Sequence, residues 1–125
     1  MQSLTTKVWG RDLSLRVYFD CCTGEEILQS QRDALEALQK SWQVVDAAKP
    51  EVERYCLENN GEDIGSGAVD NIFKYVIPEG LYVERNENKR VVLLLCAYRF
   101  DPEHGIALQF TNESLTVIDQ QDALI

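Results

Sequence analysis

One short segment of this 125-residue chain combines side chains that could do chemistry: Asp101-Pro102-Glu103-His104-Gly105. A carboxylate beside an imidazole can orient a general base, and Asp101, Glu103 and His104 could contribute ligands to a metal ion. The same residues favour a turn, because Asp and Pro suit its first two positions and Gly105 accepts a positive φ. A structural turn is the preferred interpretation, with contact to a partner and catalysis as alternatives.

Two pairs of neighbouring acids, Glu25/Glu26 and Glu62/Asp63, are weaker candidates for general acid–base chemistry. Adjacent side chains point apart, so each pair is interpreted as solvated surface. His104 is the only histidine, and no H-E-x-x-H or G-x-S-x-G motif occurs. We therefore predict no catalytic residue, no metal and no cofactor, and a protein that is not an enzyme. A metal-dependent hydrolase using the Asp101–His104 loop is kept as an alternative.

The four cysteines are Cys21, Cys22, Cys56 and Cys96, and they form no C-x-x-C motif. They are predicted to be buried, reduced thiols that behave as small apolar side chains. Reduced thiols indicate a reducing compartment. The amino-terminal residues lack a basic segment followed by an apolar one, and no apolar run approaches the length of a membrane span. A cytoplasmic location is therefore expected.

The chain carries a formal net charge of −9. Nucleic acids are bound largely through Lys and Arg, and anionic membranes attract the same residues. We therefore expect no nucleic acid and no membrane as a partner. The expected partner is a basic protein.

The chain should position these residues on a strand pair, then helices, then a β-meander. Leu13 to Phe19 alternate apolar and polar residues, as a half-buried strand does. Ser30 followed by Asp33 has the form of a helix start, and Pro50 should end that helix and open the next. The second helix should end at residues 59–61, and a third should span 69–77, with an extended backbone from Tyr75 as the alternative.

The remaining strands are expected at residues 81–85, 90–100, 106–111 and 114–118. The apolar run at 91–97 predicts a central strand covered on both faces. The fold class is α+β: an antiparallel sheet, made of the N-terminal strand pair and the C-terminal β-meander, with two to three helices mainly on one face. Residues 1–125 form a single domain. Part of the other face should lie near a surface and offer a partner site, with these candidates: Tyr18, Tyr82, Tyr98 and the Leu94/Cys96 row.

Three segments carry a family resemblance: Val8–Arg11 with Phe19–Glu25, then Asn71–Pro78, then Arg99–Ala107. They resemble a family of small bacterial single-domain proteins of unknown function that spans nearly the whole chain. Such proteins are similar to the immunity proteins of polymorphic and contact-dependent growth inhibition toxin systems. The resemblance implies a cytoplasmic inhibitor that neutralises a cognate toxin domain by direct binding. An acidic inhibitor would suit a basic nuclease toxin, because it blocks the groove meant for phosphates.

A cationic partner should dock where carboxylates gather around a few apolar anchors. Two regions meet this requirement, the corner at residues 20–26 and the loop at residues 58–70, and a third, the Asp101–His104 hairpin tip, could join either. The second is favoured because its acids are not interleaved with Lys or Arg, with a solvated loop that binds nothing as the alternative. A structural or homo-oligomeric interaction module is the alternative function, and the oligomeric state is left open. The candidate partner-binding residues are Asp20, Glu25 and Glu26 in the first region, Glu58, Glu62, Asp63 and Asp70 in the second, and Asp101, Glu103 and His104 in the third.

Overall fold

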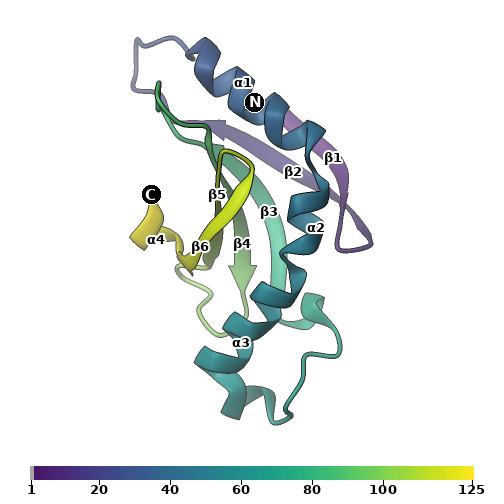
Figure 1. The fold of residues 1–125 in the computed structure, drawn as a ribbon. Helices are drawn as coiled ribbons and strands as arrows, with labels where there is room; N and C mark the ends of the chain where they lie inside the picture. The colour runs from purple at the N-terminus through teal and green to yellow at the C-terminus, as the bar shows by residue number, and fades with distance from the viewer. Residues whose placement is uncertain (1) are drawn as a thin grey trace.

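The computed structural model describes residues 2–125, in which six strands form one sheet in the order β1-β2-β3-β4-β5-β6. Along the sequence, a pair of strands comes first, three helices follow, and a four-stranded meander comes last, before the short helix at the carboxyl terminus (Figure 1). Their bounds are β1 Gln2–Val8, β2 Arg11–Phe19, α1 Gln29–Lys40, α2 Gln43–Ala47, α3 Lys49–Ile64, the 3-10 turn η1 Ile72–Lys74, β3 Val76–Val83, β4 Val91–Tyr98, β5 Ile106–Thr111, β6 Ser114–Gln120 and α4 Gln121–Leu124.

Neighbouring strands pair antiparallel except β2 and β3, which run parallel. A parallel pair needs a long crossover, and here α1, α2 and α3 supply it. These three helices lie on one face of the sheet (Figure 1). The predicted α+β fold is therefore confirmed. None of the helices within residues 2–125 is long and apolar enough to cross a membrane.

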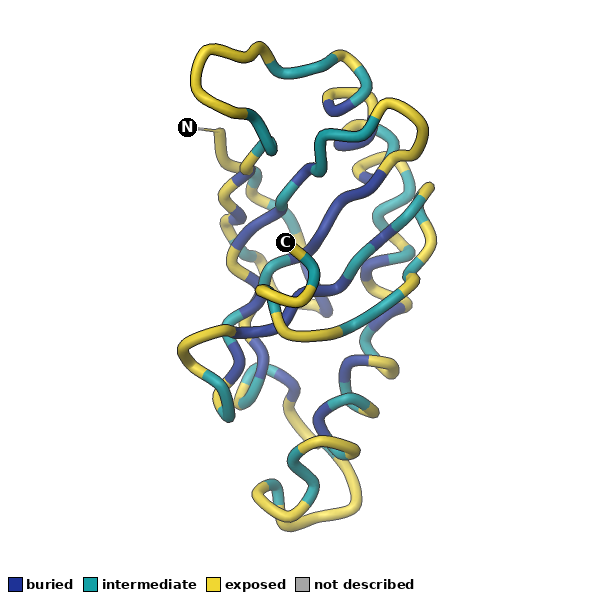
Figure 2. Tube along the Cα trace, turned by 90° about the vertical axis from the view of Figure 1, so that its left-hand side faces the viewer, coloured by how far each residue is buried: buried dark blue, intermediate teal, exposed yellow. Residues whose placement is uncertain are grey.

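Alternate residues of the central strand β4 point to opposite faces of the sheet, and both rows are largely buried. Val92, Leu94, Cys96 and Tyr98 pack in the core under the helices. Val91 and Leu93 belong to a smaller cluster with Ala107, against which Tyr82, Leu95 and Leu124 pack. The prediction of a central strand covered on both faces is confirmed for its first half (Figure 2).

The face of the sheet that the three long helices leave uncovered is called the open face here. Tyr18 and Tyr82 lie on it, as predicted, and Tyr18 is 38% exposed. The prediction was wrong for Tyr98 and for the Leu94/Cys96 row, which are buried under the helices. The reason is the strand period of two: the row that faces outward is Leu93 and Leu95.

Helix α1 begins differently from the predicted Ser30/Asp33 cap. Its N-cap is Leu28, and the side chain of Gln31 accepts a hydrogen bond from the Leu28 amide at 2.9 Å. The Gln31 amide group also donates to the carbonyl oxygens of Asp20 at 2.9 Å and Val83 at 3.2 Å. This buried glutamine therefore ties the start of α1 to the parallel β2–β3 pair.

We expect Gln31→Leu to destabilise the fold by about 2–4 kcal/mol, because it leaves the half-buried Leu28 amide and Asp20 carbonyl without this partner. Gln39→Leu, at an exposed position of the same helix, is the matched control and should change stability by about 0.5 kcal/mol or less. Urea unfolding of both variants measures the difference. Equal stabilities of the two variants would show that Gln31 does not hold the crossover in place.

The segment after α1 departs from the predicted helix boundaries. Pro50 lies in the first turn of α3, as predicted. At the predicted end of the helix, residues 59–61, α3 has a kink: the backbone of Asn60 is not helical (φ −138°, ψ 30°), and one further turn follows before the C-cap Gly65, whose φ is 76°. The predicted helix at 69–77 is instead η1 followed by β3, because the alternative of an extended backbone from Tyr75 is the one adopted. Gly61 does not end the helix since its φ is not positive.

The four cysteines are free thiols. Cys56 and Cys96 are buried, as predicted, whereas Cys22 is exposed and Cys21 is partly exposed in the loop after β2. The prediction of four buried thiols was therefore wrong for this pair. Their loop leaves the sheet after Phe19, so its side chains have no second layer to pack against.

Candidate partner-binding site

The three acidic regions lie at two ends of the molecule. The Asp20–Glu26 loop is at one end and the carboxyl end of α3 is at the other, in both views of the chain (Figures 1 and 2). The Asp101–His104 hairpin joins the α3 side, because Tyr98 at the end of β4 donates a hydrogen bond to the Asn60 side-chain oxygen at 2.6 Å. The structure thus brings the second and third regions together and separates the first.

The acids of the second region lie mainly on α3 rather than in the predicted loop. Glu58, Glu62 and Asp63 occupy its last two turns, and the last turn contains no basic residue. A helix carboxyl end is negative, so carboxylates there are unfavourable by about 0.3–1 kcal/mol each. Glu62 and Asp63, in the last turn, are therefore unfavourable toward the helix dipole, although the Asp63 carboxylate accepts a hydrogen bond from the Asn60 side chain at 3.1 Å. Asp70 lies beyond α3, and its carboxylate is 3.5 Å from the Lys74 amino group.

The Asp101–His104 hairpin is a turn whose acids are connected to the carboxyl-terminal segment. The His104 Nδ1 atom lies 2.9 Å from Asp101 Oδ1, and its Nε2 atom lies 3.6 Å from Asp122 Oδ2. The Gln120 side chain donates to Asp101 Oδ2 at 2.7 Å. Gly105 has a φ of 62°, as the turn interpretation predicted. The imidazole thus bridges the hairpin to α4.

Tyr55 and Tyr98 form an edge-to-face pair between α3 and β4, with ring centroids 6.0 Å apart. Burial raises the pKa of Tyr55, and the charges of Asp119 and Asp101 raise it further. Burial also raises the pKa of Tyr98, and Asp63 is among the groups that add to this effect. Carboxylates of α3, the hairpin and β6 are therefore close enough to act on one tyrosine pair.

We call this region the acidic end. It gathers carboxylates from α3, from the β4–β5 hairpin and from the junction of β6 and α4. Its members are Glu58, Glu62, Asp63, Asp101, Glu103, Asp119 and Asp122. Sequence reasoning missed Asp119 and Asp122, although the spacing Asp119-Gln120-Gln121-Asp122 was a usable signal of an exposed acidic terminus.

Beside the acidic end, a groove of ≈ 420 Å³ runs between α3 and the edge strand β6. Its wall on α3 includes Tyr55 and Glu58, and its wall on β6 includes Leu115 and Ile118. Aromatic and aliphatic side chains next to carboxylates are the combination found at the centre of protein interfaces. The groove offers apolar anchors adjacent to the charged surface.

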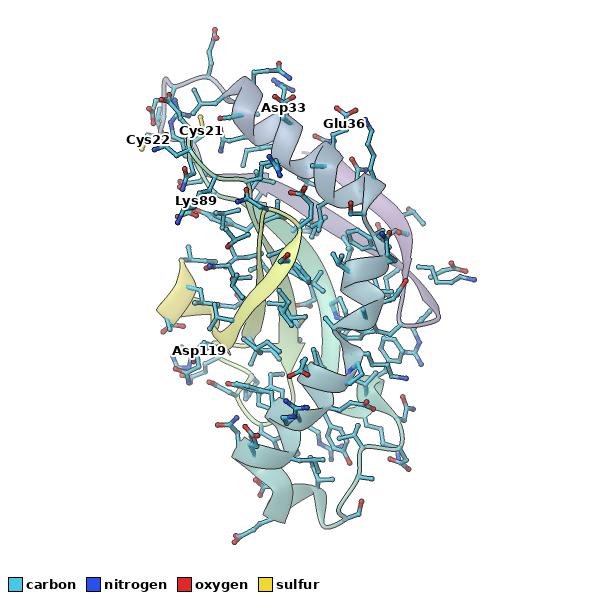
Figure 3. The ribbon with its side chains drawn as sticks, viewed as in Figure 1. Cys21, Cys22, Asp33, Glu36, Lys89 and Asp119 are labelled. Atoms are coloured by element: carbon cyan, nitrogen blue, oxygen red, sulfur yellow. The ribbon has the colours of Figure 1, made fainter. Side chains whose placement is uncertain are left out.

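In the Asp20–Glu26 loop, the Glu25 carboxylate is already paired with groups of the protein itself. Glu25 accepts a hydrogen bond from the Cys22 amide at 2.9 Å, and its carboxylate lies 3.4 Å from the Arg85 guanidinium. Hydrogen bonds from Cys22 and the charge of Arg85 lower the pKa of Glu25. Arg85 also donates to the Glu26 carbonyl at 2.9 Å, and Lys89 lies at the same end of the molecule (Figure 3). This loop presents less uncompensated negative charge than the acidic end.

Metal chemistry finds no support in the geometry. Across residues 2–125, no group of three or more His, Cys, Asp or Glu side chains is placed to hold a metal ion. In the Asp101–His104 turn, the Asp101 carboxylate contacts the His104 imidazole and the Gln120 amide group. Burial raises the pKa of Cys96, and Glu25 raises that of Cys22, so neither thiol is activated as a nucleophile.

The His104 bridge predicts a pH-dependent stability. The hydrogen bond and charge of Asp101, with Asp122, raise the pKa of His104, so its contribution is full below the ordinary histidine pKa of about 6.5. Burial acts to raise the pKa of Asp101, but the hydrogen bonds from His104 and Gln120 outweigh it and lower the net value. The carboxylate contribution is therefore present above the ordinary aspartate pKa of about 3.9.

We expect His104→Ala to lower the melting temperature more at about pH 5.5 than at about pH 8.5, since the imidazolium contribution is lost as the pH rises through the raised pKa. Thermal unfolding followed by circular dichroism at both pH values measures this. An equal loss at both values would mean that the bridge carries no charge-dependent stabilisation.

Comparison with known proteins identifies a family but no annotated relative. Residues 2–125 match the family described as "Domain of unknown function (DUF6985)". Neither the curated proteins nor the solved structures contain a match.

Proposed function

Since the chain belongs to the DUF6985 family, we propose its function from its own structure: it is a protein-binding domain that neutralises a basic protein partner by covering a positively charged surface. The observation that carries the proposal is the acidic end. Within residues 2–125, no Lys or Arg lies within ion-pair distance of Glu58, Glu62 or Asp63. No cation in that part of the chain neutralises these charges, and Glu62 and Asp63, in the last turn, oppose the dipole of the helix that carries them.

The class of partner follows from this charge and from the net charge of −9. A negative surface steers a basic protein into encounter and accelerates its association. A toxin domain that cleaves nucleic acid has such a basic surface at its active site, which is the target expected of an immunity protein. Covering that surface would exclude the phosphates of the substrate.

A cytoplasmic location is part of the same proposal. The adjacent Cys21 and Cys22 thiols are unbridged and at least partly exposed, which suits a reducing compartment. An inhibitor of an intracellular toxin activity would have to act there.

The test is to co-express the tagged chain with the protein encoded by the neighbouring reading frame. We expect the two proteins to co-purify as a complex that buries about 1,200–2,000 Å², and the chain to restore growth when the neighbour is toxic. Failure to co-purify and failure to restore growth would together overturn the proposal.

A further inference from the structure

A hollow of ≈ 340 Å³ lies on the open face, opposite α1, α2 and α3. Its walls come from β2, β3, β4 and the start of α4, and this volume is at the small end of the range for ligand pockets, about 300–1,000 Å³. It has room for one or two side chains rather than for a large ligand. The lining residues are Tyr18, Glu79, Gly80, Tyr82, Leu95 and Gln121.

Two tyrosines line this hollow because of the parallel register between β2 and β3. Tyr18 is directly opposite Tyr82, so both side chains stand on the same face at the spacing of neighbouring strands. In the adjacent row, Gly80 is opposite Arg16 on one side and Leu95 on the other. The side chains of Tyr18, Tyr82 and Leu95 thus form the walls of the hollow, and the backbone at Gly80 forms its floor.

The hollow depends on the absence of a side chain at Gly80. A Cβ atom there would lie 2.9 Å from the Arg16 carbonyl oxygen and 3.2 Å from Cε2 of the Tyr18 ring. The Tyr18 ring therefore lies over bare backbone, and a side chain at position 80 would displace it. The glycine serves this close approach, since its φ is not in the positive range.

Carboxylates surround the two rings. Glu79 lines the hollow, and Asp20 and Glu84 follow Tyr18 and Tyr82 by two residues, directly after the ends of β2 and β3. Burial raises the pKa of Tyr82 to about 12, and Asp20 and Glu84 add to the effect. Arg16, on the other side of Glu79, is the nearest cation in the same row of the sheet. Three acids against one base leave the surroundings negative.

We propose that this hollow accepts a lysine or arginine side chain from a basic segment of the partner protein. The faces of aromatic rings attract cations, and the attraction is about 0.5–2 kcal/mol depending on solvation. Glu79 supplies a carboxylate for the charged group, while Leu95 and the tyrosine rings pack against its methylene stem.

Helix α4 contributes one residue to the hollow and the next residue to the acidic end. Gln121, which lines the hollow, is next to Asp122, whose carboxylate approaches His104. A basic segment could therefore extend from the acidic end over α4 and place one side chain between the tyrosines. This inference rests on the proposed function in its choice of a basic protein, but it concerns a different surface.

The experiment is a titration of the isotope-labelled protein with short blocked peptides, followed through its backbone amide signals. The probes are a peptide of alternating glycine and lysine, its arginine counterpart, and a neutral norleucine counterpart of the same length. We expect saturable shifts at Gly80, Tyr82 and Leu95 with the two cationic peptides only. Glu79→Gln and Tyr18→Leu should each weaken this binding about fivefold or more.

Glu36→Gln, at an exposed acid on α1 in the helical layer, is the matched control and should leave the affinity unchanged (Figure 3). Equal shifts with the norleucine peptide would overturn the proposal in favour of an apolar ligand. Shifts of the same amides on raising the protein concentration alone would overturn it in favour of a second copy. Shifts confined to the acidic end would show that the hollow is not the binding site and would leave the proposed function intact. The absence of any shift would also overturn the proposal that the hollow binds a cationic side chain.

Discussion

Reversing the charge of the last turn of α3, with Glu62→Lys and Asp63→Lys together, is expected to weaken binding to a basic partner about 100-fold. The same change should slightly raise the melting temperature. Both acids are exposed at the negative end of the helix, where lysines are favourable by about 0.3–1 kcal/mol each. The affinity should therefore fall while the stability rises. A variant that simply failed to fold would lose both.

The matched control is Asp33→Lys with Glu36→Lys on α1, which makes the same change in net charge at exposed positions of another helix (Figure 3). Calorimetric titration with the partner and thermal unfolding of both double variants give the two quantities. If the α1 variant loses as much affinity as the α3 variant, only net charge matters and the acidic end is not the docking surface.

Gly105→Ala is expected to destabilise the fold by about 3 kcal/mol or more. Gly105 has a φ of 62°, and a Cβ atom there would lie 2.5 Å from the Cys96 carbonyl oxygen and 2.8 Å from the Gln121 side-chain nitrogen. The backbone of β4 cannot move away without disturbing the β4–β5 pairing. The side chain of Gln121, which donates to Cys96 at 3.2 Å, would also be displaced, and α4 with it.

Gly67→Ala is the control, because a Cβ atom at that exposed position meets no atom within 4 Å. Chemical unfolding of both variants measures the two free energies. A Gly105→Ala protein as stable as Gly67→Ala would show that the hairpin and α4 adjust freely, and the acidic end would then lack a fixed geometry.

Local patterns predicted most of the strands. The alternation at Leu13–Phe19 gave β2, and the apolar run at 91–97 gave the central position of β4. The parallel pairing of β2 with β3 was not predicted, because register between segments so far apart depends on how the crossover helices pack. The helix predicted at 69–77 is reduced to the single turn of η1, because the chain becomes extended at Val76, ahead of Pro78, and a proline disfavours helical backbone in the residue before it.

Charge and spacing predicted part of the acidic end, without Asp119 and Asp122, and did not predict how its residues are grouped in space. Ten acidic or histidine positions were named from charge and spacing, but their distribution over two ends of the molecule depends on the length and direction of α3. The compensation of Glu25 by Arg85 joins residues far apart in the chain, and sequence spacing carries no signal of it. The hollow between Tyr18 and Tyr82 likewise arises from the parallel register.

The central claim is that this chain captures a basic protein through electrostatic attraction. The measurement that tests it most directly is the association rate constant with the partner, determined by stopped flow over a series of salt concentrations. The account predicts that the rate constant falls steeply as salt rises while the dissociation rate constant changes little, with a weaker salt dependence in the Glu62→Lys/Asp63→Lys variant. A rate constant that is independent of salt, in the original chain and the variant alike, would contradict it.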